Sequence, residues 1–103
     1  GTVAERALRN HYYDVAVIGV SGITIDEGLT VDNQLDARTL EIMIEQSRRL
    51  VVVADASKVG RVHFVRLMPL AKVDMLVMDT SVSPQFRDMV SQLDVEFVGV
   101  DPA

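Results

Sequence analysis

The sequence contains no cysteine and no tryptophan among its 103 residues, and only three prolines, two tyrosines and three phenylalanines. Without cysteine the chain has no disulfide, no thiol nucleophile and no cysteine-ligated zinc site. Its two histidines, His11 and His63, have no partner four residues away, so we do not expect a metal site. We expect no cofactor either. No apolar run reaches the roughly 20 residues of a membrane helix, and no basic segment followed by an apolar one opens the chain. We therefore expect a cytoplasmic protein without membrane contact.

The composition is that of a single soluble domain. Hydrophobic residues make up 49% of the chain and charged residues 24%, which is too apolar for a disordered tail. The length leaves no room for a second domain.

Negative charge predominates, but it is unevenly distributed. The formal net charge is -5, which argues against nucleic-acid binding by this surface, because a phosphate-tracking face needs clustered lysine and arginine. Residues 48–72 nevertheless carry six basic side chains against one acidic one, Asp55. This basic segment is either a site for an anion or a solvated face that pairs with acidic neighbours, and composition alone favours the second interpretation.

Buried strands and amphipathic helices alternate along the chain. Continuous valine-rich runs at 14–19, 50–55, 73–79 and 95–100 predict strands of a parallel sheet covered on both faces. Helical spacing predicts helices over 2–10, over 33–49 and after the cap Ser83-Pro84. Residues 61–70 are ambiguous, and one interpretation is a helical turn ended by Pro69. The predicted fold is α/β, with three layers and a mostly parallel sheet between helices. A helix with no strand before it suggests a domain truncated at its N-terminus.

Two loops follow predicted strands, where ligands of such sheets bind. The first contains Gly19, Ser21, Gly22 and Thr24, whose small residues let backbone approach a ligand. The second contains Asp55, Ser57, Lys58 and Arg61, in which a lysine beside a strand-end carboxylate can hold a phosphate or a hydroxylated substrate. Each loop also has a simpler interpretation. The first is then an ordinary glycine-rich turn, and in the second Asp55 only caps the next turn while Lys58 lies in solvent.

Together these segments resemble the effector-binding domain of DeoR-type bacterial transcriptional repressors. The resemblance covers nearly the whole chain and rests on the order of residues 3–9, DVAVIGVSGI at 14–23, residues 43–45, VVVADASKVGR at 51–61, and residues 69–70 and 73–79. It implies a fold like that of ribose-5-phosphate isomerase and the CoA transferases. It also implies a domain that senses phosphorylated sugars, whose binding releases the repressor from its operator.

The resemblance further implies that the chain is a single C-terminal fragment, 1–103, of a longer oligomeric regulator. A winged helix-turn-helix that contacts DNA, and the first part of the sensor domain, would precede it. The isomerases carry the run D-G-A-D-E where this chain has residues 18–22, and their carboxylates are replaced by Ile18, Ser21 and Gly22. Because sugar isomerisation needs a placed general base, this loss favours sensing over catalysis.

Three hypotheses remain on the sequence alone. The preferred one is a non-enzymatic sensor of a phosphorylated sugar, with Ser21, Gly22, Thr24, Asp55 and Lys58 at the ligand. The second is a degenerate sugar-phosphate isomerase or CoA-transferase-like enzyme. The third is an interaction module whose loops bind no ligand.

Overall fold

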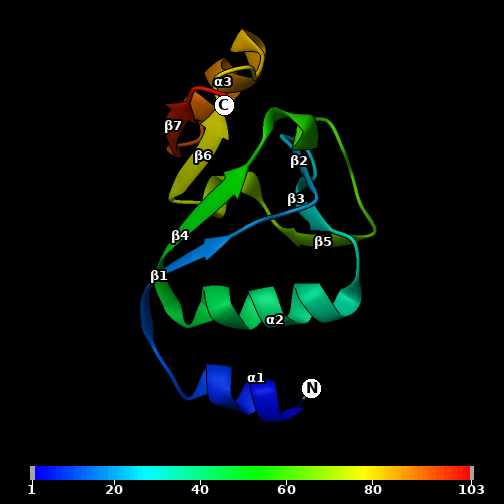
Figure 1. Ribbon diagram of the computed structural model, residues 1–103, viewed down its shortest axis with the longest axis vertical. Helices are drawn as coiled ribbons and strands as arrows, with labels where there is room; N and C mark the ends of the chain where they lie inside the picture. Colours follow the sequence, from blue (N-terminus) through cyan, green and yellow to red (C-terminus); the bar gives the residue numbers. More distant parts are fainter. Residues whose placement is uncertain (1, 103) are drawn as a thin grey trace.

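The computed structural model describes residues 2–102, which form two sheets and three helices (Figure 1). The larger sheet is parallel, with the strand order β1-β4-β6-β7. Its strands are β1 (Tyr13–Ile18), β4 (Ser47–Ala54), β6 (Met75–Asp79) and β7 (Glu96–Val100). All four predicted strands are confirmed, and the parallel sheet with its helices confirms the α/β class and is consistent with a three-layer fold, although the helices of residues 2–102 cover one face of the sheet.

A second, antiparallel sheet was not predicted. It consists of β2 (Gly22–Thr24), β3 (Gly28–Val31) and β5 (Val65–Met68), in the order β2-β3-β5. The interpretation of the ambiguous segment 61–70 as a helical turn is therefore wrong at 65–68. Pairing with β3, whose four residues are all buried, holds this segment extended. The short 3₁₀ helices η1 (Ala56–Lys58) and η2 (Leu70–Lys72) flank it.

The second and third helices begin at the residues that the sequence predicts, and each has a side-chain cap at its start. In α2 (Gln34–Glu45) the Asn33 side chain caps the first turn, and in α3 (Pro84–Ser91) Ser83 does the same by accepting from the Phe86 amide. The first helix, α1 (Thr2–Arg9), packs on α2 (Figure 1). The predicted helix over 33–49 is too long, because residues from Ser47 onward pair with β1 as part of β4.

The core lies on one face of the parallel sheet. Side chains alternate along a strand, and Ala16, Ile18, Val52 and Leu76 on this face are at most 4% exposed. They share one cluster with residues of α2, β3 and α3. The three connections step across the sheet in one direction, and right-handed crossovers then place every connecting element on the same side.

The opposite face of the sheet is not covered by residues 2–102. Val15, Val17 and Val53 point to this side and are 47%, 58% and 47% exposed. β1 is also an edge strand within the described residues, because it pairs only with β4. Parallel sheets are normally buried on both faces, and the valine-rich pattern also predicts this, whereas residues 2–102 cover only one face.

Candidate functional site

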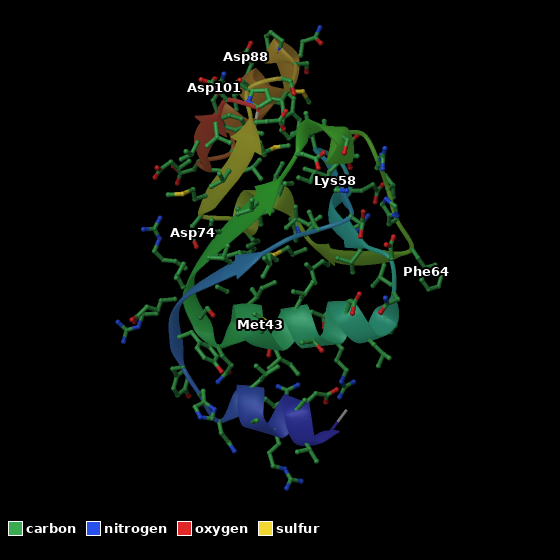
Figure 2. The ribbon with its side chains drawn as sticks, viewed as in Figure 1. Met43, Lys58, Phe64, Asp74, Asp88 and Asp101 are labelled. Atoms are coloured by element: carbon green, nitrogen blue, oxygen red, sulfur yellow. The ribbon has the colours of Figure 1, made fainter. Side chains whose placement is uncertain are left out.

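The loops singled out in the sequence lie at the carboxyl edge of the parallel sheet. Because β1, β4 and β6 are parallel, the loops that start at Gly19, Asp55 and Thr80 emerge along the same edge. Figure 2 places Lys58 beyond the end of β4, beside the hairpin of β2 and β3. This edge is where open α/β sheets bind their ligands.

The first two loops are in direct contact. The Gly60 amide donates to the Ile23 carbonyl oxygen at 2.9 Å, and Ile23 also forms a bridge with Val59. A Cβ atom on Gly22 would lie 2.2 Å from the Arg61 carbonyl oxygen, so only glycine fits there. The role of Gly22 in this structure is therefore to allow two backbone segments to approach closely.

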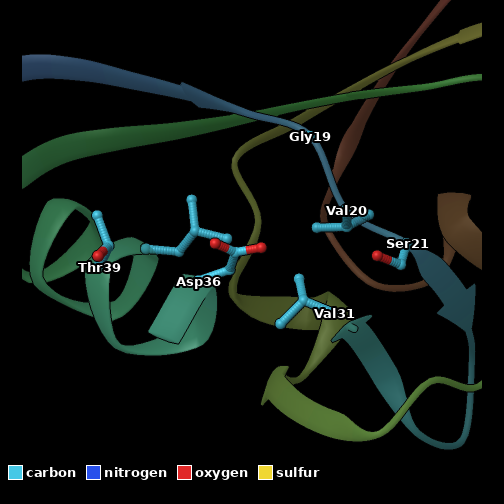
Figure 3. Close-up of a pocket in the computed structure, with 7 residues that line it drawn as sticks. Gly19, Val20, Ser21, Val31, Asp36 and Thr39 are labelled. Atoms are coloured by element: carbon cyan, nitrogen blue, oxygen red, sulfur yellow. The ribbon is translucent and has the colours of Figure 1, made fainter. Parts of the chain in front are cut away.

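A cavity of about 390 Å³ lies between the first loop and α2 (Figure 3). Its lining residues come from the first loop, from β3 and from one face of α2, and they are Gly19, Val20, Ser21, Val31, Asp36, Thr39 and Leu40. Of the predicted site residues, Gly19 and Ser21 belong to it. The sequence reasoning missed Asp36 and Thr39. Their spacing with Leu40, at i, i+3 and i+4, marks one face of a helix and was the available signal.

Two of the predicted site hydroxyl groups form hydrogen bonds within turns. Thr24 Oγ1 accepts a hydrogen bond from the Glu27 amide at 2.9 Å, at the tip of the hairpin. The Ser57 hydroxyl donates to the Asp55 carboxylate. Thr24 and Ser57 are absent from the lining of the cavity.

Asp55 caps the turn that carries Lys58. Its Oδ1 accepts from the Ser57 amide at 2.8 Å, and it stands at the N-cap of η1. Hydrogen bonds from the Ser57 hydroxyl and amide lower the pKa of Asp55, and the positive charges of Lys58 and Arg61 add to this effect. The capping interpretation of Asp55 is thus confirmed, and the same turn holds Lys58 at the carboxyl edge.

Asp79 ties the loop after β4 to the end of β6. Its carboxylate accepts from the Ala56 amide at 2.5 Å and from the Ser81 hydroxyl. The Ser81 hydrogen bond is the main cause of the lowered pKa of Asp79, whereas the neighbouring negative charge of Asp55 acts in the opposite direction. Asp79 therefore remains a carboxylate at neutral pH and fixes the position of η1.

The two cations of this loop have no ion-pair partner among residues 2–102. The ion pairs in that range are Arg9–Glu45, Arg38–Glu5, His63–Asp32 and Arg66–Glu27, with no carboxylate oxygen within 4.0 Å of the Lys58 or Arg61 nitrogens. Lys58 is half-buried and Arg61 is exposed. Of the basic segment, Arg66 pairs with an acidic neighbour, as the second interpretation of that segment expected. The other five basic side chains form no ion pair among residues 2–102, and of these Lys58 and Arg61 belong to the loop at the carboxyl edge.

Other kinds of site find no support in the part of the chain that the structure describes. No group of three or more histidine, aspartate or glutamate side chains is placed there to hold a metal ion. None of the three helices has the length and apolar character needed to cross a bilayer.

Comparison with known proteins identifies the family. The model of the DeoR C-terminal sensor domain matches residues 1–80. The chain belongs to the DeoR C-terminal sensor domain family. This confirms the resemblance read from the sequence, and it supports a ligand-sensing regulatory role.

The similar proteins are transcriptional regulators. The chain is 31% identical to the HTH-type transcriptional regulator GlpR of Haloferax volcanii and 30% identical to the HTH-type transcriptional repressor GlcR of Bacillus subtilis, each over 98 residues, or 95% of this chain. It is 35% identical over 66 residues, 64% of its length, to the glycerol-3-phosphate regulon repressor of Escherichia coli, of which the match spans 26%. This chain spans only 38% of the length of GlpR and 38% of the length of GlcR.

Proposed function

We propose that this DeoR-type sensor domain binds a phosphorylated sugar or a related metabolite at the carboxyl edge of its parallel sheet. The observation that carries the proposal is the loop that starts at Asp55, whose Lys58 and Arg61 lie beside the first loop and have no ion-pair partner among residues 2–102. The phosphate would contact Lys58, and Arg61 would add a second positive charge. The remainder of the ligand would extend toward Gly19 and Ser21.

Ligand binding would then alter how a DNA-binding domain outside this chain holds its operator. Two similar proteins are named as HTH-type regulators, and the chain spans 38% of their length. We propose that residues 1–103 form one part of an effector-binding domain, with the rest of that domain and a winged helix-turn-helix elsewhere in the complete polypeptide. The regulator would act in the cytoplasm as a homo-oligomer, as proteins that read paired half-sites do.

Lys58→Ala is expected to weaken binding of phosphorylated compounds by about 10- to 100-fold, because a charge-assisted hydrogen bond to phosphate is lost. The measurement is isothermal titration of the full-length protein with ribose 5-phosphate, glycerol 3-phosphate and fructose 1-phosphate. Lys72→Ala is the matched control, since Lys72 is an exposed lysine of the same basic segment that ends η2. Equal affinities for the wild type and both variants would place the phosphate elsewhere.

A turnover assay addresses the alternative of a degenerate isomerase. The loop at 18–22 carries no carboxylate, so incubation with ribose 5-phosphate should leave the compound unchanged. Conversion that disappears in Lys58→Ala would contradict the sensor proposal and assign the site to an enzyme.

A further inference from the structure

The wall of the cavity carries a carboxylate at the start of a helix. Asp36 is the third residue of α2, and its amide donates to Asn33 Oδ1 at 2.9 Å. In return, Asp36 Oδ2 accepts from Asn33 Nδ2 at 2.9 Å. The two side chains form a reciprocal cap, which holds the Asp36 carboxylate at the cavity.

This carboxylate makes the cavity unfavourable for an anion. The start of a helix carries a partial positive charge that can attract phosphate, but here the charge of Asp36 already offsets it. No lysine or arginine is among the lining residues. A phosphate placed in the cavity would therefore meet a like charge without a compensating cation.

The same wall suits the uncharged, hydroxyl-bearing part of a ligand. In Figure 3 the Asp36 carboxylate and the Ser21 hydroxyl point into the cavity from opposite sides. A carboxylate accepts hydrogen bonds from ligand hydroxyls, and the hydroxyls of Ser21 and Thr39 can both donate and accept. The other lining side chains are Val20, Val31 and Leu40, which offer apolar surface to the C–H groups of a sugar.

We propose that Asp36 is a specificity-determining residue, which binds the hydroxyl groups of the ligand in the cavity and excludes its phosphate from it. The phosphate is then directed to Lys58 and Arg61. The cavity and the loop that carries Lys58 and Arg61 adjoin each other, because Ser21 lines the cavity and the next residue, Gly22, packs on the Arg61 backbone. This inference rests on the proposed function and adds to it the orientation of the ligand.

Titration of the full-length Asp36→Asn variant tests the inference. The probes are ribose 5-phosphate, glycerol 3-phosphate, fructose 1-phosphate and inorganic phosphate. We expect at least a tenfold loss of affinity for the sugar and polyol phosphates, and unchanged or tighter binding of inorganic phosphate. Thr39→Val, which replaces a hydroxyl of the same wall by a methyl group, should weaken the same compounds by a smaller factor. Glu41→Gln, on the same helix but outside the lining, should change nothing.

The outcomes separate this inference from the proposed function. If Lys58→Ala abolishes binding but Asp36→Asn and Thr39→Val bind the sugar and polyol phosphates as the wild type does, the orientation is wrong and the sensing proposal stands. If Asp36→Asn binds those compounds more tightly, the cavity receives the phosphate and the inference is overturned. If the wild type binds none of the phosphorylated compounds, the proposed function fails, and the inference with it.

Discussion

Gly22→Ala is expected to lower the free energy of unfolding by about 3 kcal/mol, the upper range for forcing atoms into a packed site. The added Cβ would lie 2.2 Å from the Arg61 carbonyl oxygen and 2.7 Å from Thr30 Oγ1. Neither atom can move freely. Arg61 follows Gly60, whose amide is hydrogen-bonded to the Ile23 carbonyl oxygen. The hydroxyl of the buried residue Thr30 accepts a hydrogen bond from the His63 amide at 2.9 Å. The hairpin and the η1 loop would have to separate, which would also weaken ligand binding.

Gly19→Ala is the matched control in the same loop. The nearest atom to its added Cβ is the Val53 carbonyl oxygen at 3.9 Å, an ordinary contact, so its effect should stay within about 0.5 kcal/mol. Urea denaturation followed by circular dichroism measures both variants. Equal stability of the two would show that the first loop does not pack on the Arg61 backbone.

Val17→Asp is expected to lower the stability of the full-length protein by about 3 kcal/mol, because a charge would be forced into an apolar interface. Within residues 2–102 this side chain is 58% exposed, and the substitution would appear harmless. It stands, however, on the uncovered face of the parallel sheet beside Val15 and Val53. A parallel sheet whose second face stays in water would be exceptional.

Val62→Asp provides the control, since Val62 is 59% exposed but lies in the loop before β5 rather than on the sheet. Its effect should be within about 0.5 kcal/mol. Thermal melting of the full-length protein compares the two variants. Similar melting temperatures for both would mean that the valine face is solvated in the complete protein, and would contradict the proposal that residues 1–103 are one part of a larger domain.

The parallel sheet could be predicted because its signals are local. Continuous valine-rich runs mark strands that are buried or half-buried, and the Ser83-Pro84 cap with its apolar stripe marks α3. The second sheet gave no comparable signal, since β2 and β3 are three and four residues long and include Gly22, Gly28 and Thr30. β2 pairs only with β3, and β3 in turn pairs with β5, more than 30 residues away in the chain.

Some residues of the candidate site could also be located from the sequence, and others could not. The rule that ligands bind at the carboxyl ends of parallel strands located the loops of Ser21 and Lys58 from the sequence alone. Asp36 and Thr39 could not be assigned to the site, because their cavity forms only when α2 packs beside β1 and β3. The capping roles of Asp55 and Thr24 are local, and for Asp55 the sequence had already indicated this alternative.

The most direct test of ligand binding at the carboxyl edge is hydrogen–deuterium exchange of the full-length protein. Exchange would be compared without ligand and with whichever of ribose 5-phosphate, glycerol 3-phosphate and fructose 1-phosphate binds most tightly. Because bound ligand suppresses local opening, we predict slower exchange at the amides of residues 19–24 and 55–61. Protection confined to other segments, such as residues 80–97, or no protection at any concentration, would contradict the assignment of the sensing site.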